Sequence, residues 1–347
     1  MITLANSRRR FLQYMTLAGV GSQALLRTGD ARAALFEAKE TAGLASPWPA
    51  MTYRKLGRTE FKGSRLIFGC GAALSGKRRD ELLNTAYDGG VNVFDVGYSG
   101  YYNDAEKNLA PFLKTRQDKV FLISKARLPL DLEVDSDLTV EVAKKAAAGW
   151  LKLLEGSLKE LEVDHVDAYY IMAANNVNAI SNQEVYETFE KAKAAGKVSH
   201  LGLSTHQNAE NVLKAAIDTG WYSLAQIAIT PGGWYDWIDR EILPGSAPMK
   251  EIQPLLARAS AAGIGLVGMK AARFLAGRRF LGWGNPDAFD DFYDENLLAA
   301  RLSHFQRSYA FVLAHGLDAV NADMQNLDHL KENFIAAATS QDYFNVA

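Results

Sequence analysis

The stretch HLGLSTHQNAENVLKAAIDTGWYSLAQI, residues 200–227, decides the fold. It contains a short apolar run at 200–203, a segment with helical periodicity at 208–219, and a second apolar run at 224–227. Gly220 stands directly after the helical segment, and glycine in that position is the usual left-handed stop. Strand, helix and strand in this order predict one unit of a parallel sheet with a right-handed crossover.

The same unit recurs along the chain from Tyr53 onward. Eight strands and eight helices over about 290 residues predict a closed (β/α)8 barrel, the TIM-barrel class of α/β fold. We expect strands at 65–68, 91–94, 120–123, 166–171, 200–203, 224–227, 265–268 and 318–321. We expect helices at 79–88, 104–114, 139–161, 183–195, 208–219, 249–262, 297–314 and 326–338, several of them followed by a glycine stop (Gly89, Gly196, Gly220, Gly263 and Gly316).

A doubly wound sheet is the alternative parallel architecture. It would normally carry a glycine-rich phosphate turn after its first strand. Gly69-Cys70-Gly71 has only part of that spacing and lacks both the last glycine and the acidic residue at the required distance. The barrel is therefore favoured. Ahead of its first strand, residues 53–61 place Gly57 between apolar ends, which predicts a hairpin that closes the barrel floor.

The composition of the 347 residues excludes several classes of protein. Lys and Arg number 38 against 40 Asp and Glu, so no basic excess indicates a nucleic-acid partner. The single cysteine, Cys70, excludes an intramolecular disulfide and a multi-cysteine metal site. No apolar stretch reaches the roughly 20 residues of a stable membrane span. No pair of histidines has a metal-ligand spacing such as i and i+4, and we expect no metal.

The first 33 residues differ in charge from the rest. They carry five Arg and one Asp, in the order of a basic Ser7-Arg8-Arg9-Arg10 start, a weakly apolar stretch at 14–26 and a small-residue cleavage site, Ala31-Arg32-Ala33. This order is typical of a secretory signal, and the paired arginines resemble a twin-arginine signal for folded export. A basic amphipathic helix or a disordered tail is the alternative. We expect a signal peptide at 1–33, a leader at 34–50, a barrel at 51–347, contact with the export machinery, and a periplasmic or otherwise exported location.

Reactive groups in such a barrel stand where the strands end at the carboxyl side. Asp95 and Lys125 occupy those positions on neighbouring strands, and Tyr102 lies in the turn after Asp95. An ammonium beside a phenol lowers the phenol's pKa, and a carboxylate holds the ammonium in place. The phenol could then protonate a carbonyl oxygen as hydride reaches its carbon. A purely structural Asp95–Lys125 ion pair is the alternative.

Ordered motifs give this pattern a family resemblance. Tyr53-Arg54-x-Leu56-Gly57, Gly90-Val91-Asn92-x-Phe94-Asp95, Ile123-Ser124-Lys125, Gly202-Leu203-Ser204 and Gly268-Met269-Lys270 resemble segments of the aldo-keto reductase superfamily. Tyr102-Asn103-Asp104-Ala105-Glu106 is similar to that family's Tyr-Gly-x-Ser-Glu segment, and Met324-x-Asn326-Leu327 with Glu332-Asn333 to its last cofactor segment. The matches run in order over about residues 51–338.

The resemblance implies an oxidoreductase that transfers hydride from NADP, with NAD possible, to a small-molecule carbonyl substrate. It implies catalytic roles for Asp95, Tyr102 and Lys125. For the cofactor it implies that Ser204 and Gln226 hold the carboxamide, that Lys270 and Arg273 face the adenosine phosphate, and that Glu332 and Asn333 face the adenine.

Three positions depart from the family pattern. Met172 stands where the family has a catalytic histidine, so one hydrogen-bond donor to the substrate oxygen is missing. The turn before Tyr102 is two residues longer than usual, so Tyr101 or Tyr98 could be the acid instead. Asp323 stands near the expected phosphate and would repel it.

Two further readings follow from these departures. The chain could be an exported protein that binds a nicotinamide cofactor with little turnover, as a sensor or binding partner, or a sugar-binding protein without a cofactor. His206, at the end of a strand, could replace the missing donor, or it could be a polar loop residue. Trp234 and Trp237 could form an aromatic substrate wall, or they could simply pack their loop.

Overall fold

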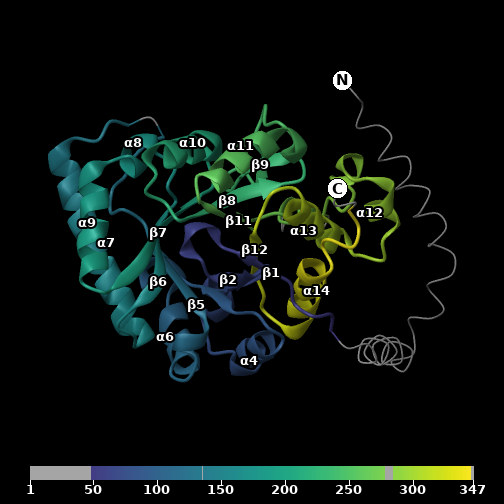
Figure 1. Cartoon of the computed structure of the whole chain (residues 1–347), viewed down its shortest axis with the longest axis horizontal. Helices are drawn as coiled ribbons and strands as arrows, with labels where there is room; N and C mark the ends of the chain where they lie inside the picture. Colours follow the sequence, from purple (N-terminus) through teal and green to yellow (C-terminus); the bar gives the residue numbers. More distant parts are fainter. Residues whose placement is uncertain (1–47, 135, 278–283, 345–347) are drawn as a thin grey trace, which may run out of the picture. The chain divides into compact units, whose positions relative to one another are not determined.

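Eight parallel strands close into a barrel in the computed structural model, which describes residues 48–134, 136–277 and 284–344 (Figure 1). Neighbouring strands pair in the order β3, β4, β5, β6, β7, β8, β11, β12, and β12 pairs again with β3. This confirms the predicted barrel. The strands are β3 (Leu66–Gly69), β4 (Val93–Asp95), β5 (Phe121–Ala126), β6 (Val166–Met172), β7 (Val198–Thr205), β8 (Leu224–Thr230), β11 (Gly265–Met269) and β12 (Ala319–Asp323).

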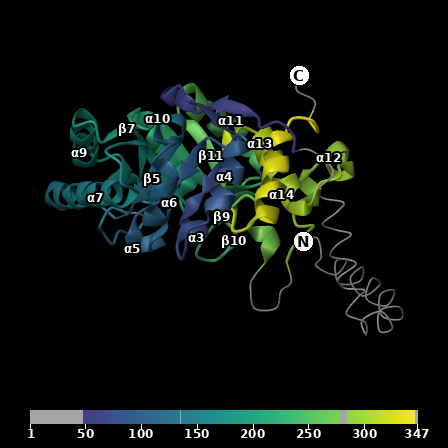
Figure 2. The ribbon, with the colours of Figure 1, turned by 90° about the horizontal axis from the view of Figure 1, so that it is seen from below.

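Helices surround the barrel, one crossover after another. The longest, α7 (Val140–Leu161), lies beside α9 (Gln183–Ala194), as Figure 1 and Figure 2 both show. The other main helices are α4 (Asp80–Asp88), α6 (Ala105–Leu113), α10 (Ala209–Thr219), α11 (Met249–Ala261), α13 (His304–Ala314) and α14 (Leu327–Ala338). Short helices lie in the loops: α3 (Cys70–Leu74), α5 (Ser99–Tyr102), α8 (Val177–Ile180) and α12 (Glu295–Ala299).

The predicted hairpin closes the floor of the barrel. Strands β1 (Tyr53–Lys55) and β2 (Lys62–Ser64) pair antiparallel around a turn at 56–61. Leu56 is fully buried and packs into the barrel interior with Ile67, Val93 and Phe121. The backbone at Gly57 has a left-handed φ of 53°, and a Cβ there would overlap the backbone of residues 263–265. Glycine at this position therefore lets the plug approach the barrel.

Arg65 fastens the barrel floor to the last helices. It directly precedes β3 and is 1% exposed. Its guanidinium donates to the carbonyl oxygens of Leu313, Leu317 and Asp318 and, at 3.1 Å, to the Ser340 hydroxyl. Burial lowers the pKa of Arg65 to about 10, so the side chain stays charged at neutral pH. One cation thus satisfies carbonyls near the end of α13 and in the loop that leads into β12.

The structure differs from the sequence expectations in three places. The helix expected at 297–314 is two helices, α12 and α13, because Ser303 starts α13 with a capping box that includes Gln306. Gly89 keeps a right-handed conformation, and Gly90, with φ 103°, makes the turn. An unpredicted hairpin, β9 (Gly233–Asp236) with β10 (Glu241–Ile242), extends the sheet antiparallel from β8.

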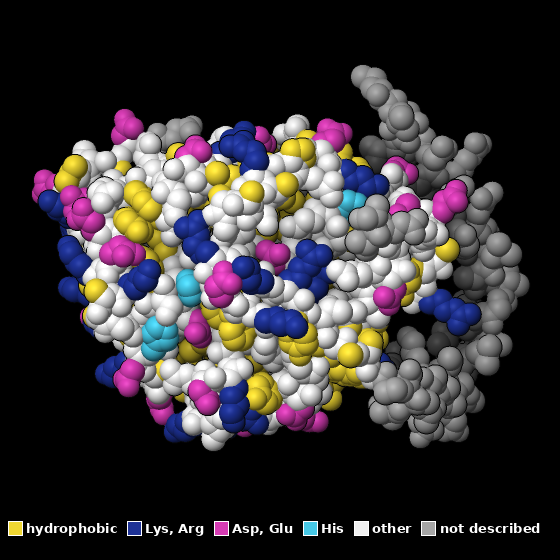
Figure 3. All heavy atoms as spheres, in the orientation of Figure 1, with side chains coloured by type: hydrophobic (Ala, Val, Ile, Leu, Met, Phe, Trp, Pro, Cys, Tyr) yellow, Lys and Arg dark blue, Asp and Glu magenta, His cyan; other side chains and the backbone are white. Residues whose placement is uncertain are grey.

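The signal peptide at 1–33 and most of the leader at 34–50 lie outside the described residues. Within the described part of the chain, no helix is both long and apolar enough to cross a bilayer. On the face drawn in Figure 3, basic and acidic side chains are interspersed.

Candidate active site

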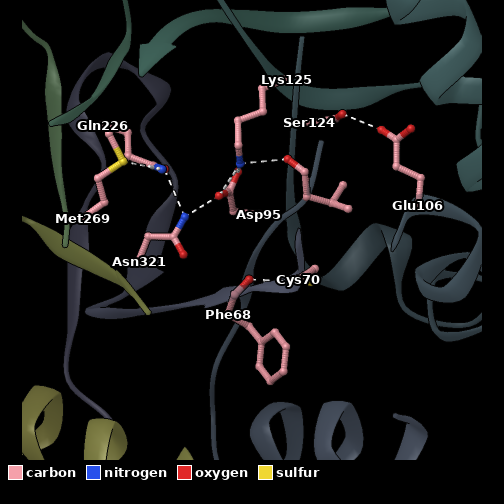
Figure 4. A network of polar contacts seen from close by, with 10 residues as sticks. Phe68, Cys70, Asp95, Glu106, Ser124, Lys125, Gln226, Met269 and Asn321 are labelled. Carbon is pink, nitrogen blue, oxygen red and sulfur yellow. Dashed lines mark hydrogen bonds and ion pairs between the residues drawn. The ribbon is translucent and has the colours of Figure 1, made fainter. Parts of the chain in front are cut away.

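A buried ion pair forms the centre of the site. Asp95 ends β4 and Lys125 lies near the end of β5, the adjacent strand, so both side chains reach the carboxyl end of the barrel. The Lys125 ammonium donates to both Asp95 oxygens, at 2.6 and 2.5 Å, and to the Val96 carbonyl oxygen at 2.9 Å (Figure 4). Asp95 is 2% exposed and Lys125 3%. Burial raises the pKa of Asp95, and the ammonium partly opposes that rise.

Asn321 joins this pair to the opposite side of the barrel. Its side-chain amide donates to an Asp95 oxygen and, at 3.1 Å, to the amide oxygen of Gln226 (Figure 4). The Gln226 amide nitrogen in turn donates to the Met269 sulfur at 3.4 Å. A thioether is only a weak acceptor, so this N–H group keeps capacity for a better partner.

Ser204 and Gln226 have the polar groups that a carboxamide requires. They face each other in register on β7 and β8. The Ser204 hydroxyl oxygen is buried and has no hydrogen-bond partner among the described residues. Buried polar groups without partners are rare in native proteins. A carboxamide, which offers both an oxygen and an NH2 group, would satisfy Ser204 and the weakly bonded amide of Gln226 together.

Tyr102 is the tyrosine that contacts the ion pair. The Lys125 nitrogen lies 5.4 Å from the centre of its ring. A Cβ added at Gly71 or Gly97 would lie within 3 Å of the Tyr102 ring carbons, and the two glycines face opposite edges of the ring. In the described coordinates, no hydrogen bond joins the Tyr102 hydroxyl to the ammonium. The position of Tyr102 is therefore fixed by contacts to its ring and not by a hydrogen bond to its hydroxyl.

The predicted direction of the Tyr102 pKa shift is wrong. The sequence argument expected the Lys125 ammonium to lower that pKa. In the structure, burial raises the pKa of Tyr102, and the Asp95 charge adds to the rise. Asp95 offsets the ammonium because the two form one tight pair. The phenol therefore keeps its proton at neutral pH, which is the form that a general acid needs.

The other two candidate tyrosines lie farther from the ion pair. Tyr101 is 41% exposed, packs edge-on against Tyr102 with ring centres 4.8 Å apart, and lies under the Arg127 guanidinium. The Tyr98 ring lies over Gly100. Among these three, the placement favours Tyr102 as the acid.

The rim of the site is aromatic and basic. Met172 ends β6, is 3% exposed and pairs in register with Ser204. The His206 ring lies 6.2 Å from the Trp237 ring, and the Lys270 nitrogen lies 4.0 Å from the centre of the Trp237 ring. Burial and the nearby cations lower the pKa of His206 to about 3. Burial also lowers the pKa of Lys270, to about 8. His206 is therefore neutral at physiological pH and keeps one N–H donor.

The remaining predicted cofactor residues do not join this cluster. Arg273 donates to the Gly277 carbonyl oxygen at 3.2 Å. Glu332 accepts a hydrogen bond from the Ser303 hydroxyl, and Asn333 is buried on α14. Asp323 is exposed at the end of β12 and accepts from Gln325 at 3.3 Å. The structure therefore brings together Asp95, Tyr102, Lys125, Ser204 and Gln226.

A separate cavity lies at the start of α14, and its lining carries three basic side chains and three acidic ones, Asp80, Glu81 and Asp328. Its volume is about 500 Å³, and residues 77–82 and 325–328 line it. Lys77, Arg78 and Arg79 contribute positive charge, although Arg78 is paired with Asp80 at 2.7 Å. A helix N-terminus favours anions because its N–H groups are unpaired.

The sequence predicts no role at the site for four residues that the structure places there: Asn321, Met269 and the two glycines beside Tyr102, Gly71 and Gly97. Asn321 had a detectable signal, because Ala319 lies in the barrel interior and a residue two positions along a strand points the same way. An Asn on that inward face is a polar group among apolar neighbours. No group of three or more His, Cys, Asp or Glu side chains that could hold a metal ion occurs in the residues that the structure describes.

Behind the ion pair lies a second buried carboxyl, Glu106. It is 1% exposed, accepts from the Ser124 hydroxyl at 2.7 Å, and its other oxygen has no partner within the described structure (Figure 4). Burial raises the pKa of Glu106 to about 7, and the hydrogen bond from Ser124 opposes the rise. The carboxyl is therefore protonated in the folded protein at mildly acidic pH.

Replacing Glu106 by Gln should change how stability depends on pH. The pKa is about 7 in the folded state, against an ordinary value of 4.5. Glu106 therefore contributes most stability below pH 4.5 and loses it as the pH rises through 7. We expect wild type to lose about 3 kcal/mol of unfolding free energy relative to Glu106→Gln over that window. Urea unfolding at several pH values measures this, with Glu141→Gln, an exposed site, as control. Parallel curves for wild type and Glu106→Gln would contradict it.

Comparison with known proteins agrees with this geometry. Residues 63–231, just under half of the chain, match the profile of the aldo/keto reductase family. An uncharacterized oxidoreductase of Bacillus subtilis, YrpG, is 27% identical over 164 residues, which are 44% of this chain and 49% of that protein. The chain thus matches about half the length of this relative.

Solved structures share the fold. An aldo-keto reductase from Bacillus halodurans, described as the holo form, superposes with a TM-score of 0.58 at 19% identity, over 82% of this chain and 90% of its own. An aldo-keto reductase from Klebsiella pneumoniae in complex with NADPH gives a TM-score of 0.59 at 18% identity, over 83% and 89%. Residues 63–231 are thus similar to the aldo/keto reductase family, and the barrel has the same fold as these solved structures.

Proposed function

We propose that this protein is an NAD(P)H-dependent oxidoreductase that reduces a small carbonyl compound. The observation that carries the proposal is the buried Asp95–Lys125 pair beside the protonated Tyr102 phenol. The bound nicotinamide would supply the hydride. Tyr102 would donate its proton to the carbonyl oxygen, and the charge that develops there would be stabilised by the Lys125 ammonium. Asp95 would hold that ammonium in position.

The residues present fit a nicotinamide cofactor. The unpartnered Ser204 hydroxyl and the weakly bonded Gln226 amide would hold the carboxamide. Support for a phosphorylated cofactor, NADP, comes from the barrel shared with the Klebsiella pneumoniae aldo-keto reductase, whose structure is a complex with NADPH. Asp323 opposes it, since a carboxylate repels a phosphate. Lys270, Arg273, Glu332 and Asn333 remain proposed contacts to the adenosine half.

Titration of the purified protein with NADPH, followed by its fluorescence, tests the proposal. We expect saturable binding that weakens about fivefold in Gln226→Leu, because one amide hydrogen bond is worth about 1 kcal/mol. Gln117→Leu is the matched control and should bind as wild type does. The Gln117 amide donates to the His165 carbonyl oxygen and not to a residue of the proposed site. Absence of binding would favour the sugar-binding alternative.

A cofactor-binding protein with little turnover is the second candidate. Met172 favours it, because a buried thioether at the end of β6 cannot donate a hydrogen bond to a substrate oxygen. Neutral His206, near the same rim, favours the enzyme, because it retains a donor. NADPH oxidation with a panel of small aldehydes separates the two candidates. Binding without turnover would select the second.

We further propose that the protein is exported folded, through the twin-arginine route, to the periplasm or beyond. Ser7-Arg8-Arg9 and Ala31-Arg32-Ala33 support it. Replacing Arg8 and Arg9 by Lys should retain the precursor inside the cell, because the paired arginines are the part of the signal that the machinery reads. Cell fractionation measures this. Unchanged export of the double variant would contradict it.

A further inference from the structure

The proposed cofactor contacts occupy one half of the barrel mouth. Ser204 lies in β7, Gln226 in β8, and Lys270 directly follows β11; these strands are neighbours, and α14 follows β12. The proposed acid follows β4 on the other half, and Met172 ends β6. A carbonyl substrate that reaches Tyr102 must therefore lie over β4, β5 and β6. The side chains that follow these strands should decide what kind of substrate is bound.

On that half, Arg127 is a cation without an ion-pair partner among the residues that the structure describes. It follows β5 directly and is exposed. Its guanidinium carbon lies 5.1 Å from the centre of the Tyr101 ring, which packs on the Tyr102 ring at 4.8 Å. Within the described part of the chain, no carboxylate lies within ion-pair distance of Arg127, and no hydrogen bond fixes it. Lys125, by contrast, is fully engaged by Asp95.

The Arg127 charge also reaches the reacting groups. It opposes the burial that raises the pKa of Tyr102, and it contributes to the low pKa of His206. Asp236 is the acidic group facing His206, and it already accepts from the backbone N–H groups of Ile238 and Asp239. The mouth beside Tyr102 therefore carries a positive charge that no ion pair among the described residues neutralises.

We propose that Arg127 binds a carboxylate carried by the carbonyl substrate, so that the substrate class is an oxo acid. A guanidinium presents two parallel donors that match the two oxygens of a carboxylate. The guanidinium stacks on the Tyr101 ring, and the Tyr101 ring packs against the Tyr102 ring, so Tyr101 lies between Arg127 and Tyr102. The carboxylate would therefore be separated from the carbonyl by a short carbon chain. This inference rests on the proposed function only in the experiment that measures turnover.

The test compares a charged and a neutral substrate of similar size, succinic semialdehyde and butanal, with NADPH. Arg127→Met should lower kcat/KM for succinic semialdehyde about 10- to 100-fold and leave that for butanal within about twofold, because a charge-assisted bidentate contact is lost only for the acid. Arg127→Lys should recover part of the loss. Arg116→Met is the matched control, because Arg116 also stacks on two rings, Tyr87 and Phe112, but precedes β5 at the other end of the barrel.

A second arm does not need turnover. Calorimetry on the NADP-loaded protein, or on the protein alone if no cofactor binds, compares butanoate with butanamide. The inference is supported if butanoate binds and butanamide does not, and if this binding is lost in Arg127→Met and kept in Arg116→Met. This holds even if no aldehyde is reduced, and in that case only the proposed reductase function fails. Equal losses for both substrates, no loss for either, or no butanoate binding would overturn it while leaving the reductase proposal intact.

Discussion

Tyr102→Phe is expected to lower turnover about 10²- to 10⁴-fold, the range that a positioned general acid contributes. The substitution removes one oxygen and keeps the ring, so the contacts with Gly71, Gly97 and Lys125 remain. NADPH affinity should stay within about twofold of wild type, because the phenol acts on the substrate oxygen and not on the nicotinamide. Steady-state kinetics with the best aldehyde and fluorescence titration with NADPH measure the two quantities.

Tyr101→Phe is the matched control for that experiment. Its ring touches the Tyr102 ring but is 41% exposed, so its hydroxyl should contribute little to the rate. If Tyr101→Phe is the slower variant, the acid has been assigned to the wrong tyrosine.

Met172→His should raise turnover, by up to about 10²-fold, if a missing donor limits the wild-type rate. A lower rate in Met172→His would show that the donor is supplied elsewhere, with His206 the nearest candidate.

Arg65→Met is expected to lower the free energy of unfolding by about 3–5 kcal/mol, because several buried carbonyl oxygens lose their only strong donor. Met fills a similar length, so the loss reports the hydrogen bonds more than a cavity. Urea unfolding followed by far-UV circular dichroism measures it. Arg54→Met is the control, since Arg54 is exposed on β1 and should change stability by about 0.5 kcal/mol or less. Equal midpoints for Arg65→Met and wild type would refute the assigned role.

The barrel could be predicted because its signals are local. Each strand is a short apolar run, and each crossover has helical periodicity that ends near a glycine or at a cap. Asp95 and Lys125 could be predicted for the same reason, because each is a polar residue where an apolar run ends. The capping box at Ser303 and Gln306 is an equally local signal, and it divides the helix predicted at 297–314 into two.

The rest of the site depends on closure of the barrel. Asn321 contacts Asp95 across 226 residues of sequence, and only the pairing of β12 with β3 brings the two together. The pKa of Tyr102 depends on how deeply its ring is buried, which no spacing in the sequence reports. The β9–β10 hairpin carries Trp237 to Lys270 through antiparallel pairing with β8, which the alternation of strands and helices does not predict.

The Tyr102 ring lies in a slot between Gly71 and Gly97, and this slot bears on how a proton donor can be held in place. Most buried phenols are oriented by a hydrogen bond to the hydroxyl, which occupies the very group that must act. Here two missing side chains hold the ring by shape, at both of its edges. The orientation of Tyr102 is thus fixed through its carbon atoms, and no hydrogen bond from a described residue occupies its hydroxyl, so the proposed acid would keep its proton and its lone pairs for the substrate.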